Sequence, residues 1–239
     1  MIFAYDFKLY KLAENLIYKI MKRRLSIFVL AAAFSLPCKA QESSVKEGKV
    51  AIMASAGYAW RTAEIDGSIT YPFRSHVEKI TSGFHFDISA YHRIAPNMGL
   101  GLKFNRYSAS AETSLAGVYL STKDRIIFIG PSFMYSNFEM DTPHKFYWDV
   151  ALGYQQYTSS NNFSGLGNFE VKGSSVGLYS TIGYQYAVSR SFLIGPQLGF
   201  GLGAVKLHVE NGRSLSLANN DKKEGLGRVS LAATATVRF

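Results

Sequence analysis

The sequence predicts an all-β protein, an eight-stranded antiparallel up-and-down transmembrane β-barrel over residues 41–239. Three observations support this fold class. With 47% hydrophobic and 18% charged residues, the chain is not disordered. Its mean hydropathy of +0.01 is too low for a bundle of membrane-spanning helices. After residue 41, segments of about ten residues alternate apolar side chains with small or polar ones, which is typical of strands in a membrane barrel.

The N-terminal 40 residues are interpreted as targeting sequence. Three basic residues, 22–24, precede a largely apolar stretch of twelve residues, 25–36, and a small residue, Ala40, closes the segment. A spanning helix needs about 20 apolar residues, so this pattern favours a cleaved secretory signal peptide over 21–40. We expect cleavage between Ala40 and Gln41. Residues 1–20 are interpreted as an upstream extension or a misassigned start.

Two alternatives exist for this segment. A short buried helix fits poorly with three adjacent basic residues and a small-residue exit. Lipidation of Cys38 is the other, although Pro37 stands where a lipoprotein signal normally has a small, flexible residue. Cleavage after Ala40 leaves a chain without cysteine and therefore without a disulfide.

The net charge changes meaning once the signal segment is removed. Residues 1–40 hold seven basic and two acidic side chains, so their loss lowers the formal charge from +9 to +4. Most of the case for a nucleic-acid partner disappears with them.

Eight alternating segments follow in order. Each has one large apolar face, and the opposite face is rich in Gly, Ala, Ser and Thr; the segments are 50–61, 80–91, 98–105, 127–136, 146–155, 175–186, 192–203 and 228–239. A soluble β-sandwich also alternates, but it would carry charges along its solvent face. Small residues instead suit the inside of a narrow, tightly curved barrel.

The connections alternate in length. Short links near 92–97, 139–143 and 187–190 alternate with longer ones near 62–78, 107–123, 158–173 and 205–226. Short periplasmic turns on one rim and long external loops on the other are typical of outer-membrane barrels. Both ends of the barrel domain are then expected on the periplasmic side.

Aromatic residues stand near the segment ends on the apolar side. Because amphipathic rings favour the headgroup level, we expect an aromatic girdle rather than core filling by Tyr58, Trp60, Tyr135, Trp148, Tyr154, Tyr184 and Tyr186. Two Ile-Gly-Pro segments, 129–131 and 194–196, place a proline inside or at the start of a strand. Proline lacks a ladder donor, so these positions predict bulges or strand starts.

The inward faces predict an interior polar plug. An eight-stranded barrel is just wide enough to be filled by its own side chains, which disfavours a diffusive pore. The expected plug residues are His85, Asp87, Tyr91, Lys103, Asp149, Arg228 and Arg238. Buried polar groups need partners, and a network inside the barrel would supply them.

The search for catalytic and binding motifs predicts no enzyme and no cofactor. His85 and Asp87 share one face, but no serine stands out as a nucleophile beside them. No two histidines have metal-ligand spacing with a carboxylate, and no loop has the context of a phosphate cradle. The last long loop is modestly basic and could meet lipopolysaccharide phosphates, although a solvated loop is the favoured interpretation.

Four features of the sequence together resemble those of a known family. They are the segment ending Ala40-Gln41, the turn 91–101 (YHRIAPNMGLG), the two Ile-Gly-Pro segments and the terminal Val237-Arg238-Phe239. Over about 50–239 the chain resembles the small outer-membrane β-barrel proteins, often called porin-family proteins, of Bacteroidetes-type bacteria. The resemblance implies that Phe239 is the assembly signal read by the barrel-assembly machinery. A lipid A deacylase would suggest a His-x-Ser strand motif, which none of the five histidines offers.

Three functions remain open at this stage. The first is an integral outer-membrane protein, monomeric, with a structural role or an external-loop partner of unknown identity. Its surroundings would be outer-membrane lipid and lipopolysaccharide, with no nucleic acid. The second is a small passive channel for solutes. The third and weakest is a lipid-modifying enzyme that uses His85 and Asp87.

Overall fold

The computed structural model describes residues 49–63, 65, 69, 71, 73–115, 118–164, 167–210 and 223–239. The expected signal peptide and its cleavage site, Ala40 and Gln41, lie outside the described residues. In this part of the chain, no helix is long and apolar enough to cross a membrane.

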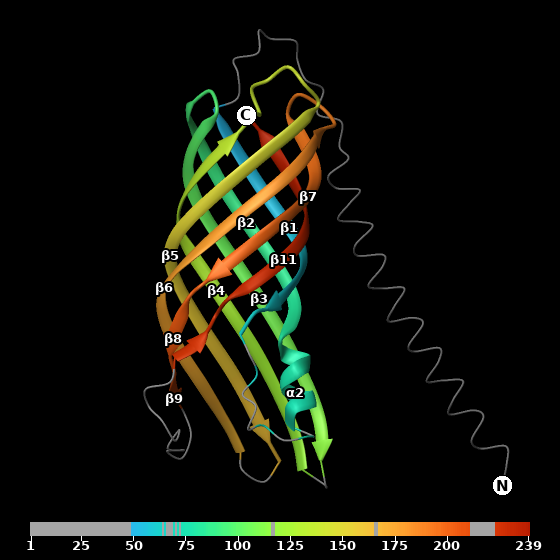
Figure 1. Ribbon diagram of the computed structural model, residues 1–239, viewed down its shortest axis with the longest axis vertical. Coiled ribbons are helices and arrows are strands. Elements are labelled where there is room, and N and C mark those ends of the chain that lie inside the picture. The colour runs from blue at the N-terminus through green and yellow to red at the C-terminus, as the bar shows by residue number, and fades with distance from the viewer. Residues whose placement is uncertain are drawn as a thin grey trace, which may run out of the picture. The chain divides into compact units, whose positions relative to one another are not determined.

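Eight long strands form one closed antiparallel barrel (Figure 1). Each pairs with its neighbour in the chain, β5 pairs with β6, and the first strand pairs with the last. The strands are β1 (Val50–Arg61), β2 (Ser82–Ala95), β3 (Met98–Leu115), β4 (Val118–Ser136), β5 (His144–Phe163), β6 (Gly167–Ala187), β7 (Phe192–Leu202) and β11 (Arg228–Arg238). The predicted fold class is confirmed.

The pairing register shows how strongly the strands are tilted. We followed the paired positions from strand to strand around the barrel, starting at Ala51 of β1. The path returns to β1 at Arg61 instead of Ala51. The residues on this path are Tyr91, Gly101, Ser132, Ala151, Tyr179, Gly201 and Arg228. The register therefore advances ten residues in eight steps. Closure with such a shear requires strands tilted by roughly 35–45° to the barrel axis.

The predicted faces of the eight segments are confirmed for the residues that lie in strands, which leaves out Ile80. Along β1, for example, exposed Ile52, Tyr58 and Trp60 alternate with buried Met53 and Ala59. The alternation follows from the strand geometry, in which successive side chains point to opposite sides. Large apolar residues therefore cover the outside of the barrel, and small or polar residues fill its inside.

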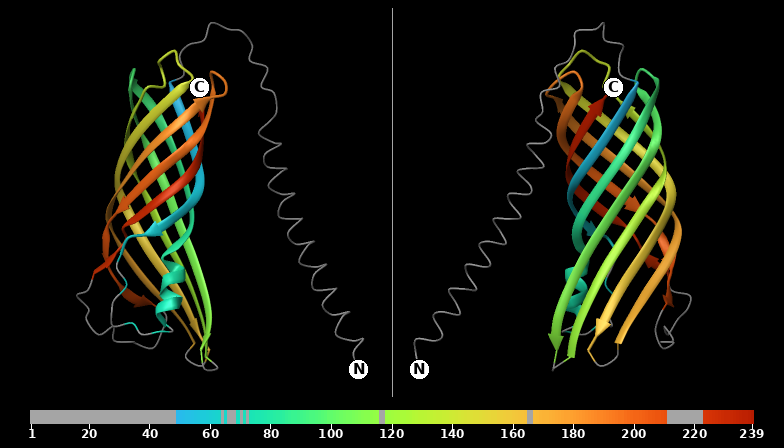
Figure 2. Two further views of the ribbon diagram at one scale, coloured as in Figure 1. Left: turned by 45° about the vertical axis from the view of Figure 1, so that its right-hand side comes forward. Right: turned by 180° about the vertical axis from the view of Figure 1, so that it is seen from behind.

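Four strands are much longer than the predicted ten residues. β3, β4, β5 and β6 contain 18, 19, 20 and 21 residues. They continue well past the ends of β1, β7 and β11, on the side away from the short turns (Figure 2). Two of the expected long loops, near 107–123 and 158–173, are therefore mostly strand.

Short elements occupy the other two expected long links. The helix α2 (Phe73–Ile80) lies in the link between β1 and β2, and Ile80, expected in a strand, is its last residue. The strands β8 (Ala204–Lys206) and β10 (Lys223–Gly225) form a two-stranded sheet, and β9 (His208–Glu210) pairs with β6. These links are therefore not plain loops.

The prediction of bulges or strand starts at the two prolines is wrong. Pro131 lies inside β4 opposite Leu102, and Pro196 lies inside β7 opposite Ala233. The register is the same before and after each proline. The pairing of β4 with β5 and that of β6 with β7 are each interrupted for two residues at the proline. A local gap in the hydrogen-bond ladder therefore accommodates the absent proline N–H.

Candidate functional site

The lumen holds a cluster of buried charged and polar side chains. At its centre, Lys103 of β3 donates from Nζ to Asp149 Oδ1 of β5 at 2.6 Å and to Thr181 Oγ1 of β6 at 2.5 Å. Asp87 of β2 lies 3.6 Å from the same amine. Lys103, Asp87 and Asp149 are at most 3% exposed. One buried cation thus bridges two carboxylates that come from different parts of the barrel wall.

A second layer surrounds Arg228 of β11. Its guanidinium donates from Nη2 to Asn105 Oδ1 at 2.7 Å and lies 5.2 Å from the ring centre of Tyr179. His85 Nδ1 is 3.2 Å from Asn105 Nδ2, and its ring stacks on Tyr179 at 6.1 Å. The Tyr179 hydroxyl is 3.0 Å from Ser230 Oγ. A neutral amide and an aromatic face therefore stabilise this buried cation.

A third cluster closes the barrel at the end opposite the short turns. Arg61, the last residue of β1, lies 3.4 Å from Asp124 and 2.5 Å from Glu224 of β10, and its Nη2 donates to the Gly225 carbonyl at 2.9 Å. Tyr157 donates its hydroxyl to Asp124 at 2.9 Å. Arg61 thus holds the β8–β10 sheet against the mouth of the barrel.

The helix α2 docks against the inner face of the long strands beside this cluster. His76 is 4% exposed, and its two ring nitrogens each lie 2.9 Å from a threonine hydroxyl, on Thr113 of β3 and Thr122 of β4. Burial lowers the pKa of His76 below its ordinary 6.5, with a further lowering from Lys79 that Asp124 partly opposes. The neutral imidazole is therefore the form that the docked helix favours.

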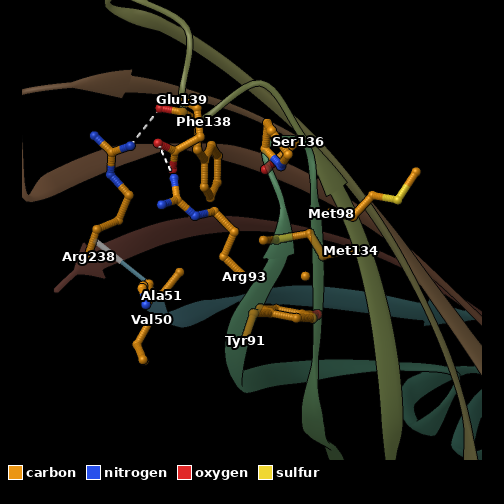
Figure 3. Close-up of a pocket in the computed structure, with 13 residues that line it drawn as sticks. Val50, Ala51, Tyr91, Arg93, Met98, Met134, Ser136, Phe138, Glu139 and Arg238 are labelled. Carbon is orange, nitrogen blue, oxygen red and sulfur yellow. Dashed lines mark hydrogen bonds and ion pairs between the residues drawn. The ribbon is translucent and has the colours of Figure 1, made fainter. Parts of the chain in front are cut away.

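The short-turn end of the barrel is closed by the turn that follows β4 (Figure 3). Phe138, 5% exposed, turns its ring inward against Tyr147. Its carbonyl accepts from Arg238 Nη1 at 2.6 Å and from Lys145 Nζ at 3.0 Å, and Arg93 forms an ion pair with Glu139 in the same turn. The pocket beside this turn has a volume of only about 30 Å³.

The structure brings together five of the seven predicted plug residues. Lys103, Asp87 and Asp149 form one layer, and His85 and Arg228 belong to the next. Tyr91 is buried but its hydroxyl is bonded to Ser132 at 3.0 Å. Arg238 is only half-buried and lies at the short-turn end, so it belongs to the closing turn rather than to the central network.

The predicted girdle residues all face outward, and they lie at two levels. Tyr135 pairs with Trp148 near the short turns, and Tyr184 and Tyr186 end β6 there. Strand pairing connects Ala54 of β1 to Tyr154 of β5 across four neighbouring strand pairs. Because the register advances ten residues in eight pairs, Tyr154 lies about five residues further from the short turns than Ala54 does. It therefore lies at the height of Tyr58 and Trp60, which contact each other edge-to-face at 5.4 Å.

Sequence reasoning missed several members of the lumen network. Asn105 and Tyr179 were on the inward faces already, but a neutral amide and a phenol carry no charge signal. Arg61 also alternated inward, at the last position of its segment. Asp124 was missed because the predicted strand began three residues later, at Ile127.

The two candidate catalytic residues are buried in the lumen and are not paired with each other. His85 and Asp87 take different partners, and they are 0% and 3% exposed inside the closed lumen. Within the described ranges, no three His, Cys, Asp or Glu side chains gather so that they could hold a metal ion. The network pairs Lys103 with two carboxylates and places Arg228 against Asn105 and Tyr179 inside the lumen.

Comparison with known proteins identifies the fold. No protein-family model and no curated protein matches the chain. Among solved structures, a major outer-membrane protein from Thermus thermophilus is similar with a TM-score of 0.52 and 12% identity, over 81% of this chain and 100% of that one. Neisserial surface protein A is similar with a TM-score of 0.51 and 19% identity, over 80% of this chain and 97% of that one. The chain therefore has the fold of the small eight-stranded outer-membrane β-barrel proteins.

Proposed function

We propose that this chain is an integral outer-membrane β-barrel protein with a side-chain-filled lumen, which acts as a structural element or through an external-loop partner in the cell envelope. The observation that carries the proposal is the opposition of its two faces. Outward residues such as Leu102, Leu152 and Val176 are 59–70% exposed, which is costly in water and favourable in lipid. The inward face holds paired charges that lipid could not solvate.

The accessory proposals follow from this one. The exported chain is cleaved between Ala40 and Gln41 and assembled by machinery that reads Phe239. That residue's N–H donates to the Val50 carbonyl at 2.9 Å, which closes the barrel seam. The assembled protein is a monomer in lipid and lipopolysaccharide, with no cofactor and no enzymatic activity. Membership of the porin-family proteins of Bacteroidetes-type bacteria is also a proposal, supported by the sequence motifs alone.

The passive-channel alternative is disfavoured by the filled lumen. A solute would have to pass the Lys103 layer, the Arg228 layer and the closing turn around Phe138. Each obstruction is buried and bonded to more than one strand or turn. The lipid-modifying alternative is disfavoured because His85 and Asp87 lie inside the lumen, away from the lipid-facing surface.

Two measurements test the proposal. The protein refolded into lipid vesicles should migrate differently on a gel when it is not boiled, as a closed barrel does, and should fractionate with outer membranes. In planar bilayers the heat-modifiable protein should show no discrete openings. Discrete conductance from protein that is verified as folded would refute the filled lumen, and soluble periplasmic protein without a mobility shift would refute membrane insertion.

A further inference from the structure

The outward face of each of the four long strands changes from apolar to polar part-way along the strand. Register links Arg106 to Ile127, Ile127 to Gln156 and Gln156 to Ser174 across these strands. On each strand, an apolar residue lies on the short-turn side of the change and a polar one beyond it: Phe104 and Arg106 on β3, Ile127 and Arg125 on β4, Tyr154 and Gln156 on β5, Val176 and Ser174 on β6. Because the register climbs ten residues in eight steps, this change lies at nearly the same height on β4, β5 and β6 and about three residues lower on β3. Such a change is expected near the level where a bilayer's hydrocarbon ends.

Basic side chains gather directly beyond this boundary. Register leads from the girdle residue Tyr58 through Phe84 and Ser108 to Arg125. These three steps correspond to a climb of about four residues, or roughly 10 Å along the tilted barrel. Lys123 lies one outward position further, and Arg106 is on the adjacent strand at the boundary; all three are exposed.

The neighbours of these cations are hydroxyl groups. Arg125 is paired with Ser108 and Thr158. Lys123 is paired with Ser110 and Ser160 in the same way. Two acidic residues lie near this row on the outward face: Glu112 is diagonal to Lys123 on β3, and Glu170 forms an ion pair with Lys172 at 3.1 Å. This part of the wall therefore presents positive charge together with hydrogen-bonding groups, which suits a phosphate.

A polar groove of about 400 Å³ begins at Lys123 and extends away from the membrane boundary. Its lining consists of hydroxyl, amide and charged groups with one aromatic residue: Ser121, Lys123, Ser160, Asn161, Asn162, Asn168, Phe169 and Glu170. Amide and hydroxyl groups match the donors and acceptors of a sugar ring. Along the outside of the barrel, an apolar surface is followed by cations and then by a groove that suits a sugar. A glycolipid with a phosphorylated headgroup has acyl chains, phosphates and sugar in the same order.

We propose that this outer wall, defined by Arg106, Lys123, Arg125 and the groove above them, binds the phosphorylated sugar headgroup of lipopolysaccharide. The acyl chains would lie along the apolar outside of β3–β6, the phosphates against the three cations, and the sugar in the groove. The proposal rests on the proposed outer-membrane location. It assigns the site to the strand wall, whereas the sequence pointed only to the basic residues of the last long loop.

The test compares lipids on folded protein in neutral detergent micelles. The midpoint of thermal unfolding, followed by loss of the unboiled gel band, is measured with lipopolysaccharide, dephosphorylated lipopolysaccharide, phosphatidylglycerol or inorganic phosphate. Lipopolysaccharide should stabilise the wild type most, because it alone offers phosphate, sugar and acyl chains together. The Lys123→Gln/Arg125→Gln variant should bind it at least tenfold more weakly, since two charge-assisted contacts are lost.

The matched control is Arg74→Gln/Lys79→Gln, which removes the same charge from exposed positions on α2 and should bind as the wild type does. Equal stabilisation by phosphatidylglycerol would overturn the sugar groove, and equal stabilisation by the dephosphorylated lipid would overturn the phosphate contacts. Equal loss in the control would mean that only net charge matters. If the wild type shows no heat-modifiable band, the proposed function itself fails; if it folds but prefers no lipid, only this site fails.

Discussion

Replacing Lys103 by methionine should destabilise the barrel strongly, because it leaves two carboxylates buried without their shared cation. The amine is 2.6 Å from Asp149 and 3.6 Å from Asp87, and all three side chains are at most 3% exposed. Methionine keeps most of the side-chain volume, so the loss of charge pairing dominates the effect.

The expected magnitude follows from the geometry. Breaking a buried ion pair by removing one partner costs about 3–5 kcal/mol. The bond to Thr181 and the contact with the Tyr179 ring, 5.3 Å from the amine, are lost as well. At about 1.4 kcal/mol per factor of ten, the ratio of folded to unfolded protein should fall between about 100-fold and several thousand-fold.

The assay is urea unfolding in lipid vesicles, followed by the unboiled gel band. Lys123→Met is the matched control, since the same change at an exposed position of β4 should cost less than about 0.5 kcal/mol. Adding Asp87→Asn and Asp149→Asn to Lys103→Met should recover part of the loss, because the uncompensated charges are then gone. If Lys103→Met and Lys123→Met unfold at the same urea concentration, the central ion cluster does not stabilise the barrel as argued.

Three further outcomes are expected. Arg61→Ala should lower the unfolding free energy by about 3 kcal/mol and expose the β8–β10 sheet to limited proteolysis, because Asp124 is left buried and uncompensated. Arg74→Ala removes one partner of an exposed ion pair and should change the unfolding free energy by less than about 0.5 kcal/mol. Equal losses in the two variants would contradict this prediction. Since the pKa of His76 is lowered by burial, the docking of α2 should be fully stable above about pH 6.5 and weaken as the pH falls below that value. The weakening is measured as faster amide exchange in the helix, and His76→Gln should abolish its pH dependence. An unchanged pH profile in the variant would show that another group causes the effect. Deleting Phe239 should reduce the amount of barrel assembled in cells while leaving refolding into synthetic vesicles nearly unchanged, and a parallel loss in both would assign the residue a role in stability instead.

The alternation of side chains predicted the barrel and the inward faces of its strands because it is a local property of each strand. Lys103, Asp149 and Asp87 could be placed inside for this reason. Which of them meet depends on the register of the four strands β2 to β5, which no single segment encodes. The choice of Asn105 and Tyr179 as partners of Arg228 was therefore out of reach.

The upper halves of the long strands escaped prediction for a physical reason. Beyond Arg106, the outward positions of β3 are Ser108, Ser110 and Glu112, while Ala109 and Ala111 face inward. The contrast between the two faces is then too small to reveal a strand. The helix α2 was missed because eight residues within a polar link give too short a pattern.

The seam between β1 and β11 has a consequence for how this protein is made. Val50 and Phe239 exchange two backbone hydrogen bonds, so the pairing that completes the barrel joins residues almost 190 positions apart. Until β11 has been synthesised, β1 and β7 both present open edges that other chains could pair with. Such a topology folds slowly and late, which favours holding the whole chain unpaired until it reaches a membrane. The unfolded chain, with its unpaired strand edges, therefore needs protection from aggregation until the barrel closes.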